Sequence, residues 1–377
     1  MILSSDQVLI DGVFQPAAIV LDNGKIHAVE GPSSKVLENT RILPGIIDLH
    51  GDAYDRHVAA RRGAVQNMSR GFWNVDAEFG ANGITTAMLA QFYSWEGGMR
   101  SPEFCRRMMS GLMLARPDLL TDIHLQLRLE VSMVDNFEDA LSIVDAFDLR
   151  YVVLNDHLPR EKLRAGKTPP RLNGTALKSG RSPEKHLAYM YEMLANEPRE
   201  AIALRRLLQS LDVRGVRVGS HDDHSIEVRA AYRDMGVGIS EFPETAEVAE
   251  DAHAHGEPVI IGAPNVVRGA SHNGNASGRD LAVRGLVNAL VSDYHYPSLI
   301  AAVETLDREG LVPFEQGWNM ISKGPAAVLG LSDRGEIATG QRADFTILDA
   351  SSGRVVATLV KGRFSFVCGE IAESLIA

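Results

Sequence analysis

Apolar and polar positions follow two different patterns along this chain. Between residues 45 and 294, short apolar runs rich in Val, Ile and Leu alternate with longer stretches of helical spacing. Alternation of this kind is typical of parallel βαβ units, in which a helix follows each strand. We predict eight strands, at residues 45–51, 83–91, 123–131, 151–157, 216–222, 238–243, 258–265 and 288–294. We predict helices at residues 102–116, 136–147, 184–211 and 244–255.

The two ends of the chain show short strands separated by turns. Asp22-Asn23-Gly24 divides two apolar alternations near the start, and Ser351-Ser352-Gly353 does so near the end. Neither end has enough strands to bury one face of a sheet alone, so we expect the two to pair. The predicted fold class is therefore α/β: a (β/α)₈ barrel at 44–335, with a small β-sandwich built from 1–43 and 336–377. Such barrels keep their chemistry at the C-terminal ends of the strands.

Composition narrows the class of protein further. The chain has no run of about 18 apolar residues, so a transmembrane helix is not expected. Its first residues lack a basic segment followed by a long apolar one, so we expect no signal peptide and a cytoplasmic location. Cys105 and Cys368 have no metal-type or redox spacing. The net charge of −11 disfavours nucleic acid as a partner, whereas homo-oligomerisation stays open.

Polar residues stand where the predicted strands end, at the mouth of the expected barrel. They are His50, Asp52, Glu130, Asp156, His157, His221, Asp222, Asp223, Glu241, Asp293 and His295. A single histidine at a strand end is usually structural, but several histidines and carboxylates at one face indicate a metal site. Imidazole and carboxylate together suit Zn²⁺, Mn²⁺ or Fe²⁺.

Several longer motifs point to a family. The stretch ILPGIIDLHGD resembles the start of the first barrel strand in the amidohydrolase superfamily, and GEIATGQRADFTILD resembles its terminal strands. More narrowly, GSHDD and GAPNVVRGASHNGN resemble the ribose methylphosphonate triphosphate diphosphatases of the carbon–phosphorus lyase pathway. The shorter motifs HGDAYDR, NDH, EFPET and SDYHYPSL agree with this, so the resemblance covers nearly the whole chain.

The resemblance implies a reaction and a set of ligands. The reaction is hydrolysis of α-D-ribose 1-methylphosphonate 5-triphosphate to the 5-phosphate and pyrophosphate. The cofactors are divalent metal ions, two in number, with zinc expected and manganese or iron as alternatives. The implied ligands are His50, Asp52, a bridging Glu130, the histidines His157 and His221, and Asp293. Asp293 is also the implied general base.

Two departures from the superfamily pattern leave the ligand set open. This chain has His50-Gly51-Asp52 where common members have His-x-His. The superfamily places its later histidines on the fifth and sixth strands, whereas our count puts His157 on the fourth and His221 on the fifth. Either the strand count is shifted by one or the site is rearranged, and Glu241 is a reserve ligand.

A small phosphorylated anion would require cationic or N–H-rich contacts near the mouth. Arg56 follows the first strand, and a glycine-rich loop after the seventh carries Arg268, Ser271, His272 and Asn273. The segment 160–185 is locally basic and is expected to act as a mobile lid. The alternative function is hydrolysis of a C–N bond, as in cyclic amides, deaminases or deacetylases, because fold does not fix chemistry. A binding module without catalysis is the remaining alternative.

Overall fold

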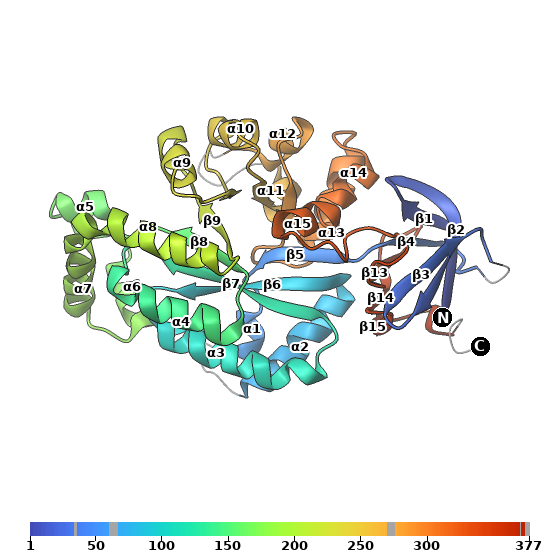
Figure 1. The fold of residues 1–377 in the computed structure, drawn as a ribbon, viewed down its shortest axis with the longest axis horizontal. Helices are drawn as coiled ribbons and strands as arrows, with labels where there is room; N and C mark the ends of the chain where they lie inside the picture. Colours follow the sequence, from blue (N-terminus) through green and yellow to red (C-terminus); the bar gives the residue numbers. More distant parts are fainter. Residues whose placement is uncertain (34–35, 60–66, 270–275, 370, 374–377) are drawn as a thin grey trace.

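Figure 1 shows a computed structural model of the chain, which describes residues 1–33, 36–59, 67–269, 276–369 and 371–373. The molecule has two parts that lie side by side. One is a set of parallel strands surrounded by helices, and the other is a sheet that holds both ends of the chain. The predicted fold class, an α/β barrel with a small β structure built from the termini, is confirmed. The division into 1–43 plus 336–377 and 44–335 stays a prediction.

Eight strands form the barrel, and each is hydrogen-bonded in parallel to the next strand along the chain. They are β5 (Ile46–Gly51), β6 (Ile84–Tyr93), β7 (Asp122–Glu130), β8 (Tyr151–Asn155), β9 (Arg217–His221), β10 (Ile239–Glu241), β11 (Val259–Gly262) and β12 (Ala289–Val291). All eight lie within the predicted runs or extend them by at most two residues. Buried Val, Ile and Leu dominate these strands because both faces of a parallel sheet are covered.

The barrel closes between its first and last strands at the end where the polar residues gather. The Asp293 N–H donates to the His50 carbonyl at 2.8 Å, and the Asp52 N–H donates to the Asp293 carbonyl at 2.9 Å. Further down the seam, the Ile47 N–H donates to the Ile321 carbonyl at 2.9 Å rather than to β12. The two strands therefore meet directly only at the mouth, beside His50 and Asp52.

Helices follow the barrel strands and cover the outside of the barrel (Figure 1). They are α1 (Asp55–Val58), α2 (Met68–Ala81), α3 (Pro102–Ala115), α4 (Phe137–Phe147), α5 (Arg160–Arg164), α6 (Leu172–Ser179), α7 (Pro183–Ala195), α8 (Glu197–Val213), α9 (Ile226–Arg233), α10 (Ala246–Ala254), α11 (Ala263–Arg268), α12 (Gly278–Val283), α13 (Ser298–Arg308), α14 (Phe314–Asn319) and α15 (Lys323–Leu329). Among these described helices, none combines the length and the apolarity that a membrane crossing needs.

The helix predicted at 184–211 is wrong in one respect, because the structure has two helices there. Helix α7 ends at Ala195 and α8 begins at Glu197, with Asn196 between them. Pro198 is the physical reason. It has no N–H to donate to the preceding turn and its ring clashes with that turn, so it is tolerated only in the first turn of a helix.

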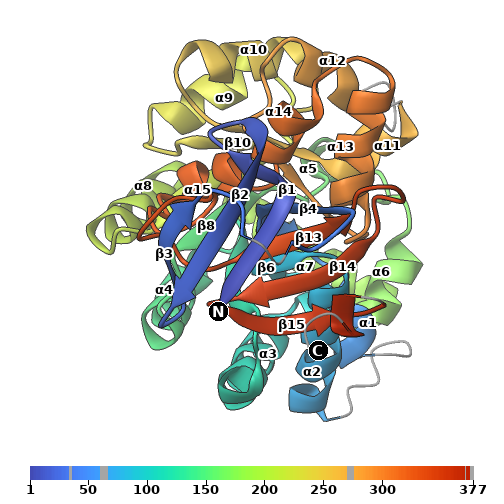
Figure 2. The same cartoon turned by 90° about the vertical axis from the view of Figure 1, so that its right-hand side faces the viewer.

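Seven strands from the two chain ends form one sheet, in the order β15-β14-β13-β4-β1-β2-β3. They are β1 (Ile2–Ile10), β2 (Val13–Asp22), β3 (Lys25–Glu30), β4 (Thr40–Pro44), β13 (Phe345–Asp349), β14 (Val355–Val360) and β15 (Arg363–Val367). Figure 2 shows the strands of the two ends crossing each other. Ile19 and Ile26 share one apolar core with Phe345 and Leu359, so each end buries the other.

The turn between β2 and β3 has the conformation that its sequence predicts. Asn23 and Gly24 both have positive φ, of 48° and 77°, and Asp22 pairs with Lys25 across them. Two successive residues with positive φ define the hairpin turn that matches the twist of antiparallel strands. Asparagine and glycine are the residues that adopt this backbone at least cost.

An ion-pair network ties the base of the barrel to the segment that leads into the terminal sheet. Asp122, the first residue of β7, accepts hydrogen bonds from Arg334 at 2.6 Å and Arg342 at 2.5 Å, and lies 3.0 Å from the His124 ring. Partial burial favours the neutral acid, but His124 and the two arginines outweigh it and hold the pKa of Asp122 far below its usual range. The carboxylate is therefore charged at neutral and mildly acidic pH.

We expect Asp122→Asn to lower the free energy of unfolding by about 3 kcal/mol at neutral pH, because the two arginines lose their shared anion. A lowered folded-state pKa contributes stability above the unfolded value of about 3.9 and loses it as the pH falls below that value. The difference between wild type and variant should therefore shrink below about pH 4. Urea unfolding from pH 3 to 7 measures this, with Asp118→Asn, an exposed position, as control. A difference independent of pH would contradict it.

Candidate metal centre at the barrel mouth

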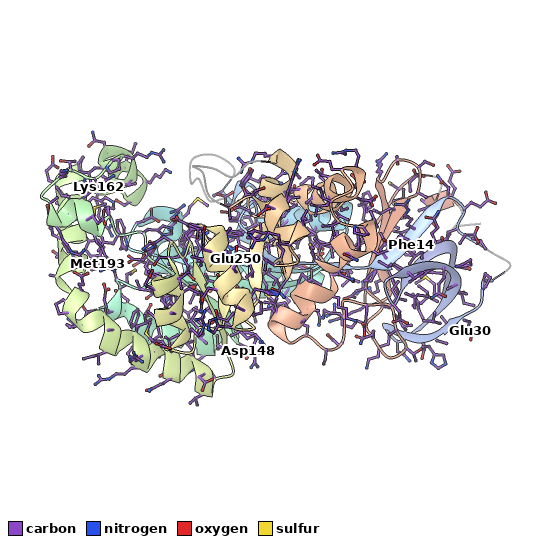
Figure 3. All side chains as sticks on the ribbon, turned by 90° about the horizontal axis from the view of Figure 1, so that it is seen from above. Phe14, Glu30, Asp148, Lys162, Met193 and Glu250 are labelled. Carbon is purple, nitrogen blue, oxygen red and sulfur yellow. The ribbon has the colours of Figure 1, made fainter. Side chains whose placement is uncertain are left out.

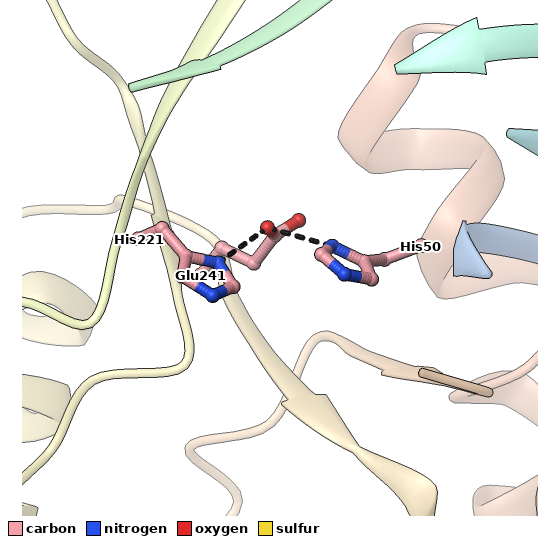
Figure 4. A group of neighbouring side chains, drawn as sticks. All are labelled: His50, His221 and Glu241. Carbon is pink, nitrogen blue, oxygen red and sulfur yellow. Dashed lines mark hydrogen bonds and ion pairs between the residues drawn. The ribbon is translucent and has the colours of Figure 1, made fainter. Parts of the chain in front are cut away.

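Glu241 ends the sixth barrel strand and accepts hydrogen bonds from four side chains. Its Oε1 lies 2.9 Å from Nδ1 of His50 and 2.9 Å from Nδ1 of His221 (Figure 4). Its Oε2 accepts from the Gln126 amide at 2.7 Å and the Tyr151 hydroxyl at 3.1 Å. Burial alone would raise the pKa of Glu241, but the two histidines outweigh it, so the net shift is downward. Glu241 is therefore a buried carboxylate that is fully engaged in holding its neighbours.

Arg128 fixes which ring nitrogen of each histidine carries the proton. Its Nη2 lies 2.8 Å from Nε2 of His221, and its Nη1 lies 3.4 Å from Nε2 of His50. A guanidinium can only donate, so both Nε2 atoms accept and both Nδ1 atoms carry the hydrogen that Glu241 receives. The rings stack with centroids 5.5 Å apart. The two imidazoles thus present their Nε2 lone pairs toward one region, which the guanidinium fills.

The pKa shifts of these groups follow from the same contacts. Burial, with Arg128 adding to it, lowers the pKa of His221 to about 3. Burial also lowers the pKa of His50, but the charge of Glu241 more than offsets this, so the net shift is upward. The guanidinium of Arg128 has its pKa lowered, chiefly by burial. His221 is therefore neutral at physiological pH and able to act as a ligand.

A second cluster lies around Glu130 at the end of β7. Its carboxylate accepts from the backbone N–H of His157 at 3.1 Å and from the ring Nδ1 of the same residue. Burial lowers the pKa of His157, but Glu130 outweighs it, so the net shift is upward. Glu96, in the loop after β6, joins the cluster, and one possible ligand atom from each of the three residues lies within 4.8 Å of the others.

The site also contains three residues that were not predicted from the sequence: Gln126, Arg128 and Glu96. Side chains alternate across a strand, so Gln126 and Arg128 share the inward face of β7 with Glu130. Polar residues at inward positions of a barrel strand are a signal that the sequence carried. Glu96 offered no such signal, because it lies three residues beyond the end of β6 and only the path of that loop brings it to Glu130.

The other two predicted ligands, Asp52 and Asp293, border these clusters. Both are half-buried beside the seam that joins β5 to β12. Burial raises the pKa of Asp293 to about 6, with His50 opposing and Asp52 adding to the shift. Neither carboxylate belongs to the two clusters found among the described residues. The structure thus joins His50 with His221, and Glu130 with His157, and leaves Asp52 and Asp293 at the edge.

The strand count made from the sequence agrees with the structure. His157 follows the fourth barrel strand, His221 ends the fifth and Glu241 ends the sixth. The site therefore differs from the common superfamily pattern at the sixth strand, where a glutamate stands in place of a histidine. Imidazole and carboxylate groups suit a divalent transition metal, and a carboxylate that receives N–H bonds from ligating histidines is a usual support for one. The residues fit such an ion.

Of the five residues predicted to contact phosphate, two lie in the described part of the chain, and both have side-chain partners there. Arg56 pairs with Glu78, and its guanidinium lies 5.5 Å from the centre of the Tyr296 ring. Arg268 donates to the Asn265 side chain at 2.9 Å. The remaining predicted contacts lie outside the described residues; they are Ser271, His272 and Asn273.

The basic segment 160–185 folds into α5, α6 and the start of α7, at the end of the molecule opposite the terminal sheet. Figure 3 shows Lys162 there, far from Phe14 and Glu30. Arg160 pairs with Glu200 at 3.0 Å, and Arg164 pairs with Glu197. These two guanidinium groups are matched by carboxylates of α8. The expectation that the segment is a mobile lid stays a prediction.

A cavity of about 750 Å³ lies beside the clusters. Its walls include His157 and His221, together with Asn155 at the end of β8 and the carboxylates of Asp222 and Glu244. Cavities that bind small molecules have volumes of about 300–1,000 Å³. The cavity is therefore large enough for a small substrate and reaches one histidine of each cluster.

Comparison with known proteins identifies the family. A sequence model of the Amidohydrolase family matches residues 272–366. The chain is 30% identical over 359 residues to the Alpha-D-ribose 1-methylphosphonate 5-triphosphate diphosphatase of Escherichia coli (strain K12), which covers 92% of this chain and 94% of the relative.

Solved structures share the fold at low sequence identity. An N-acetyl-D-glucosamine-6-phosphate deacetylase from Mycobacterium smegmatis has a TM-score of 0.63 and 15% identity, covering 97% of this chain and 99% of that one. A beta-aspartyl dipeptidase from Fervidobacterium islandicum AW-1 has a TM-score of 0.63 and 14% identity, covering 97% and 96%. The chain belongs to the amidohydrolase superfamily of metal-dependent hydrolases, and within it to the family of the ribose 1-methylphosphonate 5-triphosphate diphosphatase.

Proposed function

We propose that this protein hydrolyses a ribose 1-methylphosphonate 5-triphosphate to the 5-phosphate and pyrophosphate, in the catabolism of phosphonates. The observation that carries the proposal is the pair of imidazole–carboxylate clusters that open onto one cavity at the barrel mouth. The substrate class comes from the relative that matches this chain over 92% of its length.

The proposed metal ligands are those that the family resemblance implies. They are His50, Asp52, Glu130, His157, His221 and Asp293, and we propose two divalent ions, with zinc preferred over manganese or iron. When bound, such ions lower the pKa of a water molecule and neutralise charge on the phosphoryl oxygens. Glu241 takes no ligand role in this proposal, because its oxygens already receive four hydrogen bonds; it orients His50 and His221.

The chain's own side chains supply the remaining steps. Asp293 is the proposed general base, because it lies two residues beyond the last barrel strand and its backbone is bonded to both His50 and Asp52 at the mouth. Asp222 and Glu244 place carboxylate oxygens on the cavity wall, where they would accept hydrogen bonds from ribose hydroxyls. The small substrate then lies with its sugar toward these carboxylates and its phosphates toward the clusters.

We expect zinc-loaded protein to release pyrophosphate, not orthophosphate, from the ribose triphosphate, as followed by phosphorus NMR. Asp293→Asn should lower kcat about 10²- to 10⁴-fold, the usual effect of removing a positioned general base. Asp212→Asn, an exposed carboxylate at the end of α8, serves as the control and should leave kcat unchanged.

The same preparation tests the alternative of C–N bond hydrolysis. N-acetylglucosamine 6-phosphate and a cyclic amide should remain intact under conditions in which the triphosphate is consumed. Release of acetate or ring opening, with the triphosphate untouched, would replace the proposed function by amidase-type chemistry. Orthophosphate as the first product would exclude a diphosphatase.

We expect Glu241→Gln to weaken zinc binding about 10- to 100-fold, the usual cost of losing a carboxylate that supports metal ligands. The amide has one oxygen where the carboxylate has two, so it cannot accept from all four donors. Chelator competition measures the affinity, and Glu247→Gln in α10, which is exposed, is the matched control. Unchanged affinity in a folded Glu241→Gln protein would show that His50 and His221 do not hold the ion.

A further inference from the structure

Arg128 is a buried cation whose hydrogen bonds go to uncharged acceptors. The residue is 5% exposed, and its three nitrogens contact Nε2 of His50, Nε2 of His221 and the amide oxygen of Asn155. Among the ion pairs of the described residues, none includes Arg128. By contrast, the buried guanidinium of Arg229 pairs with both Asp223 and Glu257. A buried charge is costly unless opposite charges accompany it. The carboxylates of Glu241, Asp52 and Asp222 act on Arg128 without bonding to it, so its N–H groups can still take a directly bonded anion.

The guanidinium of Arg128 lies directly behind the wall of the cavity. Two of its three hydrogen-bond partners, Asn155 and His221, line that cavity. Its central carbon is 4.0 Å from the centre of the Phe92 ring, and Phe92 lies against His157, with ring centroids 5.8 Å apart. The ring holds the planar guanidinium in one orientation at low cost. A planar fork of N–H groups in a fixed orientation matches the oxygens of a phosphoryl group.

Arg128 and a metal ion require the same lone pairs. An imidazole that carries its hydrogen on Nδ1 has one acceptor, Nε2, and in this structure Arg128 contacts the Nε2 of both His50 and His221. His50 and His221 would hold an ion through these two nitrogens, and the terminal N–H groups of Arg128 would then lack those acceptors. Asn155 and His221, which Arg128 contacts, line the cavity, so an anionic oxygen bound in the cavity beside them would replace the lost acceptors. Metal loading and anion binding are therefore expected to support each other through this one side chain.

We propose that Arg128 binds the pyrophosphate portion of the substrate, by donating hydrogen bonds to its anionic oxygens. The inference rests on the proposed function for the identity of the anion, and on the contacts of Arg128 for the site. Under this proposal, the residue that binds the phosphate oxygens is an inward-facing residue of β7. Arg56, which was predicted from the sequence for this task, already has a carboxylate partner in Glu78.

The test is calorimetric titration of inorganic pyrophosphate into zinc-loaded protein. Arg128→Met should weaken binding about 10- to 100-fold, the range expected for lost charge-assisted hydrogen bonds. Arg128→Lys should weaken it less, because it keeps the charge but loses the fork. Arg41→Met is the matched control, since Arg41 also lies over aromatic rings, 5.6 Å from the centre of Phe14 and 5.2 Å from that of Phe314, and also bonds an uncharged amide. It should bind pyrophosphate as the wild type does.

Zinc content and melting temperature, measured on the same samples, separate the outcomes. Pyrophosphate affinity equal to wild type in folded Arg128→Met overturns the proposal. An additional equivalent of zinc in that variant, with pyrophosphate affinity unchanged, would also overturn it and show that the guanidinium only balances the imidazoles. If Arg128→Met does not fold, Arg128→Lys decides, because wild-type pyrophosphate affinity in that variant is contrary to a bidentate contact.

The same measurements distinguish failure of this inference from failure of the proposed function. Weak pyrophosphate binding in Arg128→Met, together with no hydrolysis of the triphosphate by wild type, would support the anion site at Arg128 and contradict the proposed reaction. Hydrolysis by wild type, with kcat/KM and pyrophosphate affinity both unchanged in Arg128→Met, would remove only the role of Arg128.

Discussion

Glu241 receives hydrogen bonds from His50 on β5, Gln126 on β7, Tyr151 on β8 and His221 on β9, while it stands on β10 itself. One carboxylate thus connects five strands across the interior of the barrel. Burying its charge is costly, and the four donors offset that cost only when all of them are in place. The orientation of both imidazoles, and therefore the direction of their Nε2 lone pairs, depends on this one group.

The seam between the first and last strands adds a second constraint on the same place. The backbone bonds between His50, Asp52 and Asp293 exist only at the mouth, whereas the other end of the seam is bridged by Ile321. Closure of the barrel and placement of three candidate ligands are consequently one event.

The arginines near the barrel mouth differ in the partners of their guanidinium groups. The chain carries a net charge of −11, and several arginines near the mouth, such as Arg56, Arg160 and Arg164, are matched by carboxylates. Arg128 is different, because its hydrogen bonds go to imidazole nitrogens and an amide. In a low-dielectric interior a charge without a directly bonded counter-ion acts strongly on a nearby anion, even though Glu241, Asp52 and Asp222 partly offset the charge of Arg128.

Residue patterns alone determined the eight strands, the paired termini, the turn at Asn23-Gly24 and the presence of histidines and carboxylates at the mouth. These features are local: apolar period, turn chemistry and strand-end polarity are each encoded within about ten residues. The break between α7 and α8 is also encoded locally, by Pro198, although the sequence was interpreted as one long helix over 184–211 and that prediction was wrong.

The tertiary structure decided which of these residues meet. His50 and Glu241 are 191 positions apart, and Arg128 reaches both histidines only because three separate strands aim their side chains at the barrel axis. Such contacts depend on strand order, register and the path of loops, which no local pattern specifies.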